Sequence, residues 1–181
     1  VLVAVTGLFK ISSLRHLRHT NWTEYVVAMA ALAGVLSSGL LRGVLIGAVI
    51  SLVLLIRRAS RPHVAFLGRI PGTRRFSDHE RHPDNEEIPG VLVVRPEASL
   101  IYFNMDHVRD TIMERVRTGT TPPRLVVLDL SASAHVDMHS AHMLAELAAE
   151  LTAAGIQLRA VEARAAVRDR LRNEGVEAQL G

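Results

Sequence analysis

The sequence predicts α-helical membrane segments followed by an α/β domain with a mostly parallel or mixed four-stranded sheet and helices. Residues 26–56 indicate the membrane part, because Arg42 is the only charged residue in these thirty-one positions. The α/β part is indicated by short apolar runs that alternate with amphipathic stretches later in the chain. We therefore expect the end of a membrane domain over 1–62, a linker over 63–89 and the α/β domain over 90–181.

Charge and composition separate the same two parts. Residues 1–62 carry seven Lys or Arg and one acid, whereas residues 63–181 carry fourteen Arg and seventeen acids, which together give the net charge of +3. The positive charge lies beside apolar sequence and aromatic residues are only 4% of the chain, so composition argues against a nucleic-acid-binding protein. The absence of cysteine excludes disulfides, thiolate nucleophiles and Cys-based zinc sites.

The apolar run 26–56 is too long for one upright membrane span. At about 1.5 Å per residue it would form a helix of roughly 46 Å, against a hydrocarbon core of about 30 Å. Its flanks, "KISSLRHLRH" and "RRASR", are both basic, and basic flanks favour the cytoplasmic side. We therefore expect a hairpin of two helices of about fifteen residues each, which reverses within the Gly- and Ser-rich stretch "GVLSSGLLRG".

Other residues near this run fit a membrane boundary. Trp22 and Tyr25 lie where an interfacial aromatic belt would place them, and Arg42 is expected to extend its side chain to the surface near the turn. Residues 1–9 are almost entirely apolar and have no signal-peptide pattern, so they are interpreted as the end of an earlier span in a longer protein. Three arginines are expected to anchor the hairpin to anionic lipid: Arg57, Arg58 and Arg61.

The α/β domain is expected to contain four strands and three helices. Asn104 is the expected N-cap of the first helix and Asp137 that of the second, and Gly155 and Gly175 follow the ends of the last two helices. The strands are predicted over 91–94, 99–103, within "PPRLVVLDL" (122–130) and over 156–161. The helices are predicted over 104–117, 138–153 and 164–173.

Polar residues gather where the strand within 122–130 leads into its helix. Zinc ligation by His135, His139 and His142 matches no metal-binding spacing, and Ser140 lacks the Gly-x-Ser-x-Gly turn of an activated nucleophile. We therefore expect no catalytic residue, no metal and no cofactor. The interpretation that remains is a solvent-exposed turn on which Asp137 caps the helix.

The stretch "LVVLDLSASAHVDMHSAHML" resembles the signature of STAS domains, which anti-sigma factor antagonists share with the cytoplasmic tails of sulfate permease (SulP) anion transporters. "GVLIGAVISLVLLIRRASRPHVAFLGRIPGT" is similar to the end of the SulP membrane domain and its connection to the STAS domain. "EEIPGVLVVRPEASLIYFNMDHVRDTI" resembles the first STAS strands and the following helix. The resemblance covers practically the whole chain.

In stand-alone STAS switches the matching motif is Asp-Ser-Ser-Gly, and its second Ser is phosphorylated. Here His139 occupies that position and Ser140 replaces the Gly, so the resemblance does not imply a serine phosphoswitch at this site. It implies instead a regulatory contact surface, and its histidines suggest sensitivity to pH near neutrality. The residues expected on this surface are Asp137, His139, Ser140, Ser133 and His135.

The resemblance implies the C-terminal part of a dimeric, multi-pass transporter of the cell inner (plasma) membrane, with its STAS domain in the cytoplasm. The transported ion would be sulfate, bicarbonate or a similar anion, driven by proton or sodium symport. Its binding site would lie between half-helices upstream of Val1, so no substrate-binding residue is expected here. Membrane lipid, a second copy and a cytosolic protein are the expected partners. The alternative is a STAS signalling module of the anti-sigma-antagonist type, and the STAS domain is expected to be cut short at its C-terminus.

Overall fold

The computed structural model describes residues 22–119 and 121–181, and it divides the chain into two compact units, Val1–Arg57 and Arg58–Gly181. The apolar segment over 1–9 and the basic flank over 10–19 lie outside the described residues.

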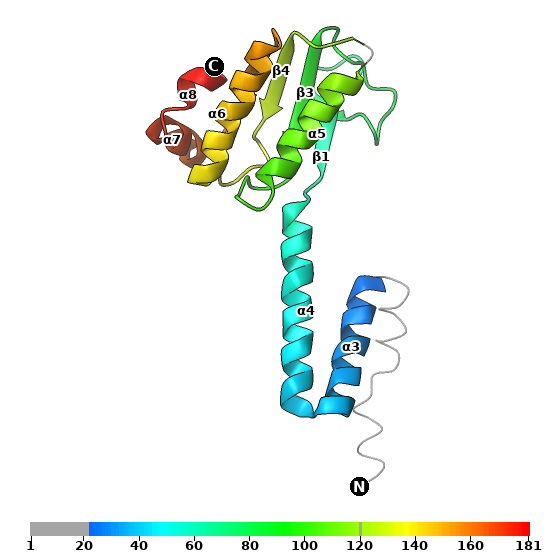
Figure 1. Cartoon of the computed structure of the whole chain (residues 1–181). Helices are drawn as coiled ribbons and strands as arrows, with labels where there is room; N and C mark the ends of the chain where they lie inside the picture. The colour runs from blue at the N-terminus through cyan, green and yellow to red at the C-terminus, as the bar shows by residue number, and fades with distance from the viewer. Residues whose placement is uncertain (1–21, 120) are drawn as a thin grey trace. The chain divides into compact units, whose positions relative to one another are not determined.

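Two helices make up the described part of the first unit, and the second of them continues three residues beyond it (Figure 1). Helix α3 spans Trp22–Ser38 and helix α4 spans Leu40–Ser60, and the chain reverses at Gly39 with φ +86°. A positive φ costs glycine little, and one glycine therefore suffices for the turn. With 17 and 21 residues, both helices are longer than the expected fifteen, because the turn takes a single residue and α4 continues to Ser60.

Glycine brings the two helices close together. A Cβ atom on Gly43 would overlap the backbone and side chain of Val35, and one on Gly47 would lie 2.9 Å from the Cβ of Ala31. Gly43 and Gly47 are the buried residues of α4. Small residues at the contact let helix backbones approach closely, which is how helices associate in lipid.

The second unit contains one mixed five-stranded sheet of order β2-β1-β3-β4-β5. Strand β1 is antiparallel to both β2 and β3, whereas β3, β4 and β5 are parallel. The strands are β1 (Val64–Arg69), β2 (Phe76–Asp78), β3 (Val91–Pro96), β4 (Leu125–Asp129) and β5 (Gln157–Val161).

The prediction of four strands is wrong. The range 63–89, expected as a linker, contributes β1 and β2 to the sheet, and residues 99–103 form no strand. In that segment Leu100 makes one isolated bridge to Val136, and the Asn104 side chain accepts a hydrogen bond from the Ile101 N–H at 3.0 Å. This local bond turns the chain toward the next helix and ends the extended conformation.

Four helices accompany the sheet (Figure 1): α5 (Met105–Thr118), α6 (Met138–Ala153), α7 (Ala165–Asn173) and α8 (Glu177–Leu180). The predicted helices are confirmed within one residue at each end, although Asn104 does not cap α5 with its side chain. The core lies between the sheet and α5 and α6, with Val126 and Leu128 of β4 facing this layer. Its fully buried large side chains include Val108, Ile112, Leu144, Leu147 and Leu151.

Candidate interaction surface at the start of helix α6

The loop between β4 and α6 is held by backbone hydrogen bonds and by its own polar side chains. Asp129, the last residue of β4, accepts a hydrogen bond from the Ser131 N–H at 2.9 Å. The Ser133 hydroxyl is fully buried and donates to the Ala98 carbonyl at 2.8 Å. Ser133 therefore ties this loop to the segment that follows β3.

The same two segments are joined again beside α6. The Leu100 N–H donates to the His135 carbonyl at 3.0 Å, and the Asp137 N–H donates to the Leu100 carbonyl at 3.1 Å. Two loops more than thirty positions apart in sequence thus form one platform at the start of α6.

Asp137 is the N-cap of α6, as predicted, and it also bonds the neighbouring loop. One carboxylate oxygen accepts from the Ser140 N–H at 2.8 Å and the other from the Tyr102 N–H at 2.8 Å. Burial by itself would raise the pKa of the Asp137 carboxyl, but these backbone hydrogen bonds and the nearby His139 outweigh it and lower the pKa. The group is therefore ionised at neutral pH and suited to bind both N–H groups.

Around this cap the surface is aromatic and apolar. Tyr102, Phe103 and Met138 are each more than half exposed. The Tyr102 ring lies 4.8 Å from the His139 ring and 5.8 Å from the Phe103 ring, measured between centroids. Tyr102 and Phe103 were predicted to lie in a strand and were therefore not expected on this surface. The signal that would have found them is Asn104, whose side chain favours a turn just before a helix.

The predicted surface residues differ in their accessibility. His135 and His139 are exposed and Asp137 is half-buried, whereas Ser133 and Ser140 are fully buried. Ser133 holds the platform through its hydroxyl and Ser140 through its backbone N–H, whereas the other three residues are available to solvent.

The third histidine of the motif, His142, lies elsewhere. Its Nε2 atom is 3.2 Å from a carboxylate oxygen of Glu174, which follows α7. Within residues 22–119 and 121–181, the His, Asp and Glu group with ligand atoms close enough for a metal ion includes none of the three histidines of this motif.

The predicted lipid-anchoring arginines lie at the end of α4 and just after it. Arg57, Arg58 and Arg61 are all exposed, and none makes an ion pair with a residue in the described part of the chain. Their charges are therefore accessible to solvent or to an anionic surface.

Known proteins resemble both units. A probable sulfate transporter of Mycobacterium tuberculosis (strain H37Rv) is 28% identical over 181 residues, which are 100% of this chain and 32% of that protein. Sulfate transporter 2.1 of Arabidopsis thaliana is 31% identical over 169 residues, 87% of this chain and 25% of that protein. The chain thus spans about a third or less of the length of these relatives.

A solved structure has the same fold. The murine solute carrier 26 family member A9 anion transporter, in the inward-facing state, matches with a TM-score of 0.78 over 88% of this chain and 26% of that chain, at 19% identity. The family model described as the STAS domain matches residues 82–180, more than half of the sequence. The resemblance to STAS domains and sulfate transporters is therefore confirmed, and the chain belongs to the STAS domain family.

Proposed function

We propose that this chain is the C-terminal part of a SulP-type secondary active anion transporter, in which residues 1–62 are the end of the membrane domain and the STAS domain that follows is cytoplasmic. The transported anion would be sulfate or bicarbonate-like, carried by symport in a dimeric, multi-pass protein of the inner (plasma) membrane. The sulfate-transporter relatives, which match both the apolar helices and the STAS domain, support this proposal.

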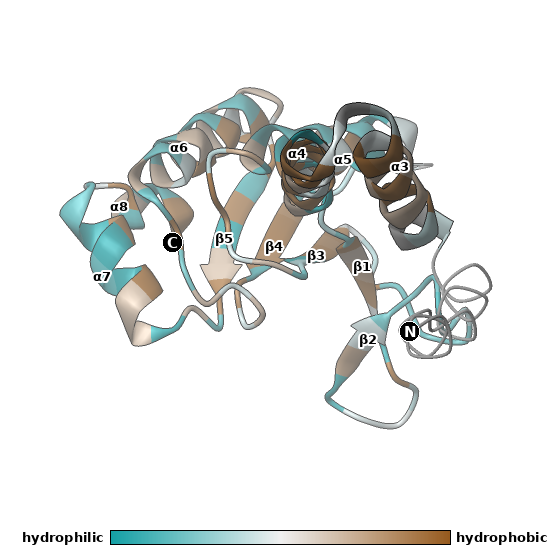
Figure 2. Cartoon of the chain, turned by 90° about the horizontal axis from the view of Figure 1, so that it is seen from below, coloured by the Kyte–Doolittle hydropathy of each residue, from teal (hydrophilic) through white to brown (hydrophobic). Residues whose placement is uncertain are grey.

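The exposed apolar surface of the hairpin is the observation that carries the proposal. Among the described residues, α4 is the helix long and apolar enough to cross a membrane, and its 21 residues correspond to about 31 Å, close to the hydrocarbon thickness. In Figure 2 helices α3 and α4 are mostly coloured as hydrophobic, whereas α7 is mostly coloured as hydrophilic. Leu36 and Leu41 are 80% and 75% exposed, respectively, which is costly in water and favourable in lipid.

The polar residues at the ends of the hairpin fit the same placement. Trp22 is exposed and its ring lies 5.5 Å from that of Tyr25, so both can occupy the interfacial region. Arg57, Arg58 and Arg61 follow the apolar part of α4, where cytoplasmic arginines meet anionic lipid headgroups.

In this proposal the STAS domain regulates transport through the platform at α6. His135, Asp137 and His139 would contact a second copy or a cytosolic protein, together with the apolar side chains beside them, and Ser133 and Ser140 would hold that surface in shape. Exposed aromatic residues next to polar ones are frequent at the centres of protein interfaces. An anti-sigma-antagonist-like module would also use such a surface, but it would leave the apolar hairpin unexplained.

Membrane extraction tests the proposal. The chain, expressed in bacteria, should stay in the membrane pellet after an alkaline carbonate wash and dissolve only with detergent. Fragment Arg58–Gly181, which lacks most of the hairpin, is the matched control and should be released by carbonate. Release of the whole chain by carbonate, or a monodisperse whole chain without detergent, would contradict the membrane placement and favour the signalling module.

A further inference from the structure

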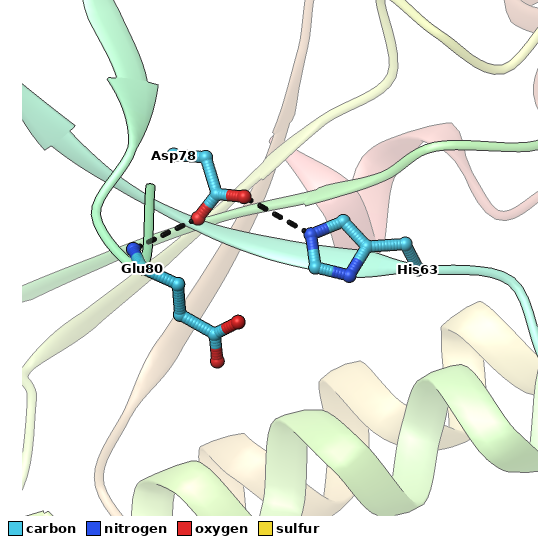
Figure 3. A group of neighbouring side chains, drawn as sticks. All are labelled: His63, Asp78 and Glu80. Carbon is cyan, nitrogen blue, oxygen red and sulfur yellow. Dashed lines mark hydrogen bonds and ion pairs between the residues drawn. The ribbon is translucent and has the colours of Figure 1, made fainter. Parts of the chain in front are cut away.

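A group of His, Asp and Glu side chains lies at the β1–β2 edge of the sheet (Figure 3). His63 directly precedes β1, Asp78 ends β2, and Glu80 lies two residues farther along. Their potential ligand atoms all lie within 4.8 Å of one another. Fourteen residues separate His63 from Asp78, so no local sequence motif indicates this group.

The backbone on both sides of the group is fixed. The His63 carbonyl accepts from the Glu97 N–H at 2.9 Å, and the His79 N–H, next to Asp78, donates to the Phe66 carbonyl at 2.9 Å. Strand pairing places Asp78 opposite Leu67. Two of the three side chains therefore start from positions that the sheet defines.

The three side chains are already partly arranged as ligands. His63 Nε2 lies 3.1 Å from Asp78 Oδ2, and the second oxygen of Asp78 accepts from the Glu80 N–H at 3.0 Å. Asp78 is buried, whereas His63 and Glu80 are exposed. The Glu80 carboxylate makes no hydrogen bond or ion pair with a residue described in the structure, so its rotation is unhindered.

The Asp78 carboxylate is buried and has polar groups close to both oxygens. His63 Nε2 lies at 3.1 Å, the Glu80 N–H at 3.0 Å and Arg81 Nε at 3.6 Å. A buried, ionised carboxylate needs positive partners. A metal ion bound between Asp78 and a neutral His63 would supply this positive charge.

The donor set restricts the kind of ion. One imidazole nitrogen and two carboxylate oxygens suit zinc and neighbouring divalent transition metals, whereas magnesium and calcium prefer oxygen ligands alone. Donor atoms in a tetrahedral zinc site are about 3.3 Å apart, so a small rotation of the exposed Glu80 side chain would bring this group to that spacing. Water would occupy the fourth position.

Arg81 opposes cation binding. Its Nε atom lies 3.6 Å from the Asp78 carboxylate, but its side chain is 75% exposed and can turn into solvent. Removing this arginine would leave the ligands intact and reduce the local positive charge.

We propose that His63, Asp78 and Glu80 form a binding site for a divalent transition-metal ion, best suited to zinc, that fastens the start of β1 to the end of β2. The site does not depend on the transport function, since all its ligands belong to the STAS domain unit.

Calorimetric titration of the whole chain in detergent micelles with zinc chloride tests this site, and visible absorption of bound cobalt reports its coordination. We expect one site whose affinity falls at least about tenfold in Glu80→Gln and in His63→Ala, and rises several-fold in Arg81→Ala. At one zinc concentration, the unfolding temperature of the unchanged chain should also rise more than that of Glu80→Gln.

His142→Ala is the matched control. It also removes an exposed histidine beside a carboxylate, that of Glu174, but these two residues belong to no group of three potential metal ligands in the described part of the chain. This variant should bind zinc as the unchanged chain does. Glu80 is exposed and its side chain is unbonded, so Glu80→Gln should fold even if His63→Ala does not. Equal zinc affinity in Glu80→Gln and the unchanged chain, or no binding by the unchanged chain, would overturn the proposal.

Discussion

The Asp137 carboxylate joins a helix and a loop through two backbone hydrogen bonds. We predict that Asp137→Ala destabilises fragment Arg58–Gly181 by about 1–2 kcal/mol at pH 7, because it removes the helix cap. Asp137→Asn should lose less stability, because asparagine also caps helices. Some loss should remain, because its side chain has no second acceptor oxygen for the Tyr102 N–H. Urea unfolding at pH 7 measures both values.

The same carboxylate contributes to acid sensitivity. Its pKa is lowered in the folded state, so its stabilising contribution is present above the unfolded pKa of about 3.9 and is lost as pH falls through the folded pKa. Asp137→Asn should therefore lose less stability than the unchanged fragment when the pH is lowered through this window. Parallel stability curves for the two proteins from pH 6 to about pH 2 would contradict the role given to this charge.

Ser133 provides a second test at the scale of single residues. Ser133→Ala removes the donor to the Ala98 carbonyl inside the fold, and we expect a loss of about 1–3 kcal/mol in the free energy of unfolding. Ser131→Ala is the matched control, because Ser131 uses its backbone N–H and should lose almost nothing. Equal unfolding midpoints for the two variants in urea would show that the platform does not depend on the Ser133 hydroxyl.

At the scale of elements, the helices were predicted correctly because the sequence signals that determine them lie close together in the chain. The apolar stripe of α5, the Asp137 cap of α6 and the glycines after α6 and α7 are all encoded within a few residues, and these helices were predicted correctly. Strands β1 and β2 were missed because β1 pairs with β3, which follows a long polar loop. Pairing between segments so far apart produces no pattern within a few neighbouring residues.

The candidate site shows the same limit. The sequence indicated Asp137 and the exposed histidines, because they lie in one motif. It did not indicate Tyr102 and Phe103, which reach the platform through hydrogen bonds between separate loops. The His63, Asp78 and Glu80 group likewise depends on the antiparallel pairing of β1 and β2.

The edge strands make a testable contribution to stability. Fragment 85–181 lacks β1, which pairs with β3 and buries Val64, Ala65 and Leu67. We expect it to unfold at a much lower temperature than Arg58–Gly181, with a broad transition, because removal of β1 exposes one edge of β3 and its core neighbours. Circular dichroism melting compares the two fragments, and a cooperative transition of 85–181 at the temperature of the longer fragment would show that β1 is dispensable.

At the scale of the whole molecule, two units with different surfaces follow one another in the chain. The hairpin exposes large apolar side chains along α3 and α4, whereas the second unit buries its apolar residues between a sheet and its helices. This contrast is the physical basis of our proposal that the first unit lies in lipid and the second in the cytoplasm.

The topology of the hairpin is the most direct test of this account. The chain has no cysteine, so single-cysteine variants Ser12→Cys, Leu40→Cys and Arg61→Cys can be labelled in oriented membrane vesicles with a reagent that does not cross the membrane. We predict that positions 12 and 61 react from the cytoplasmic face only and that position 40, next to the turn, does not react from that face. Labelling of positions 12 and 61 from opposite faces would contradict the account.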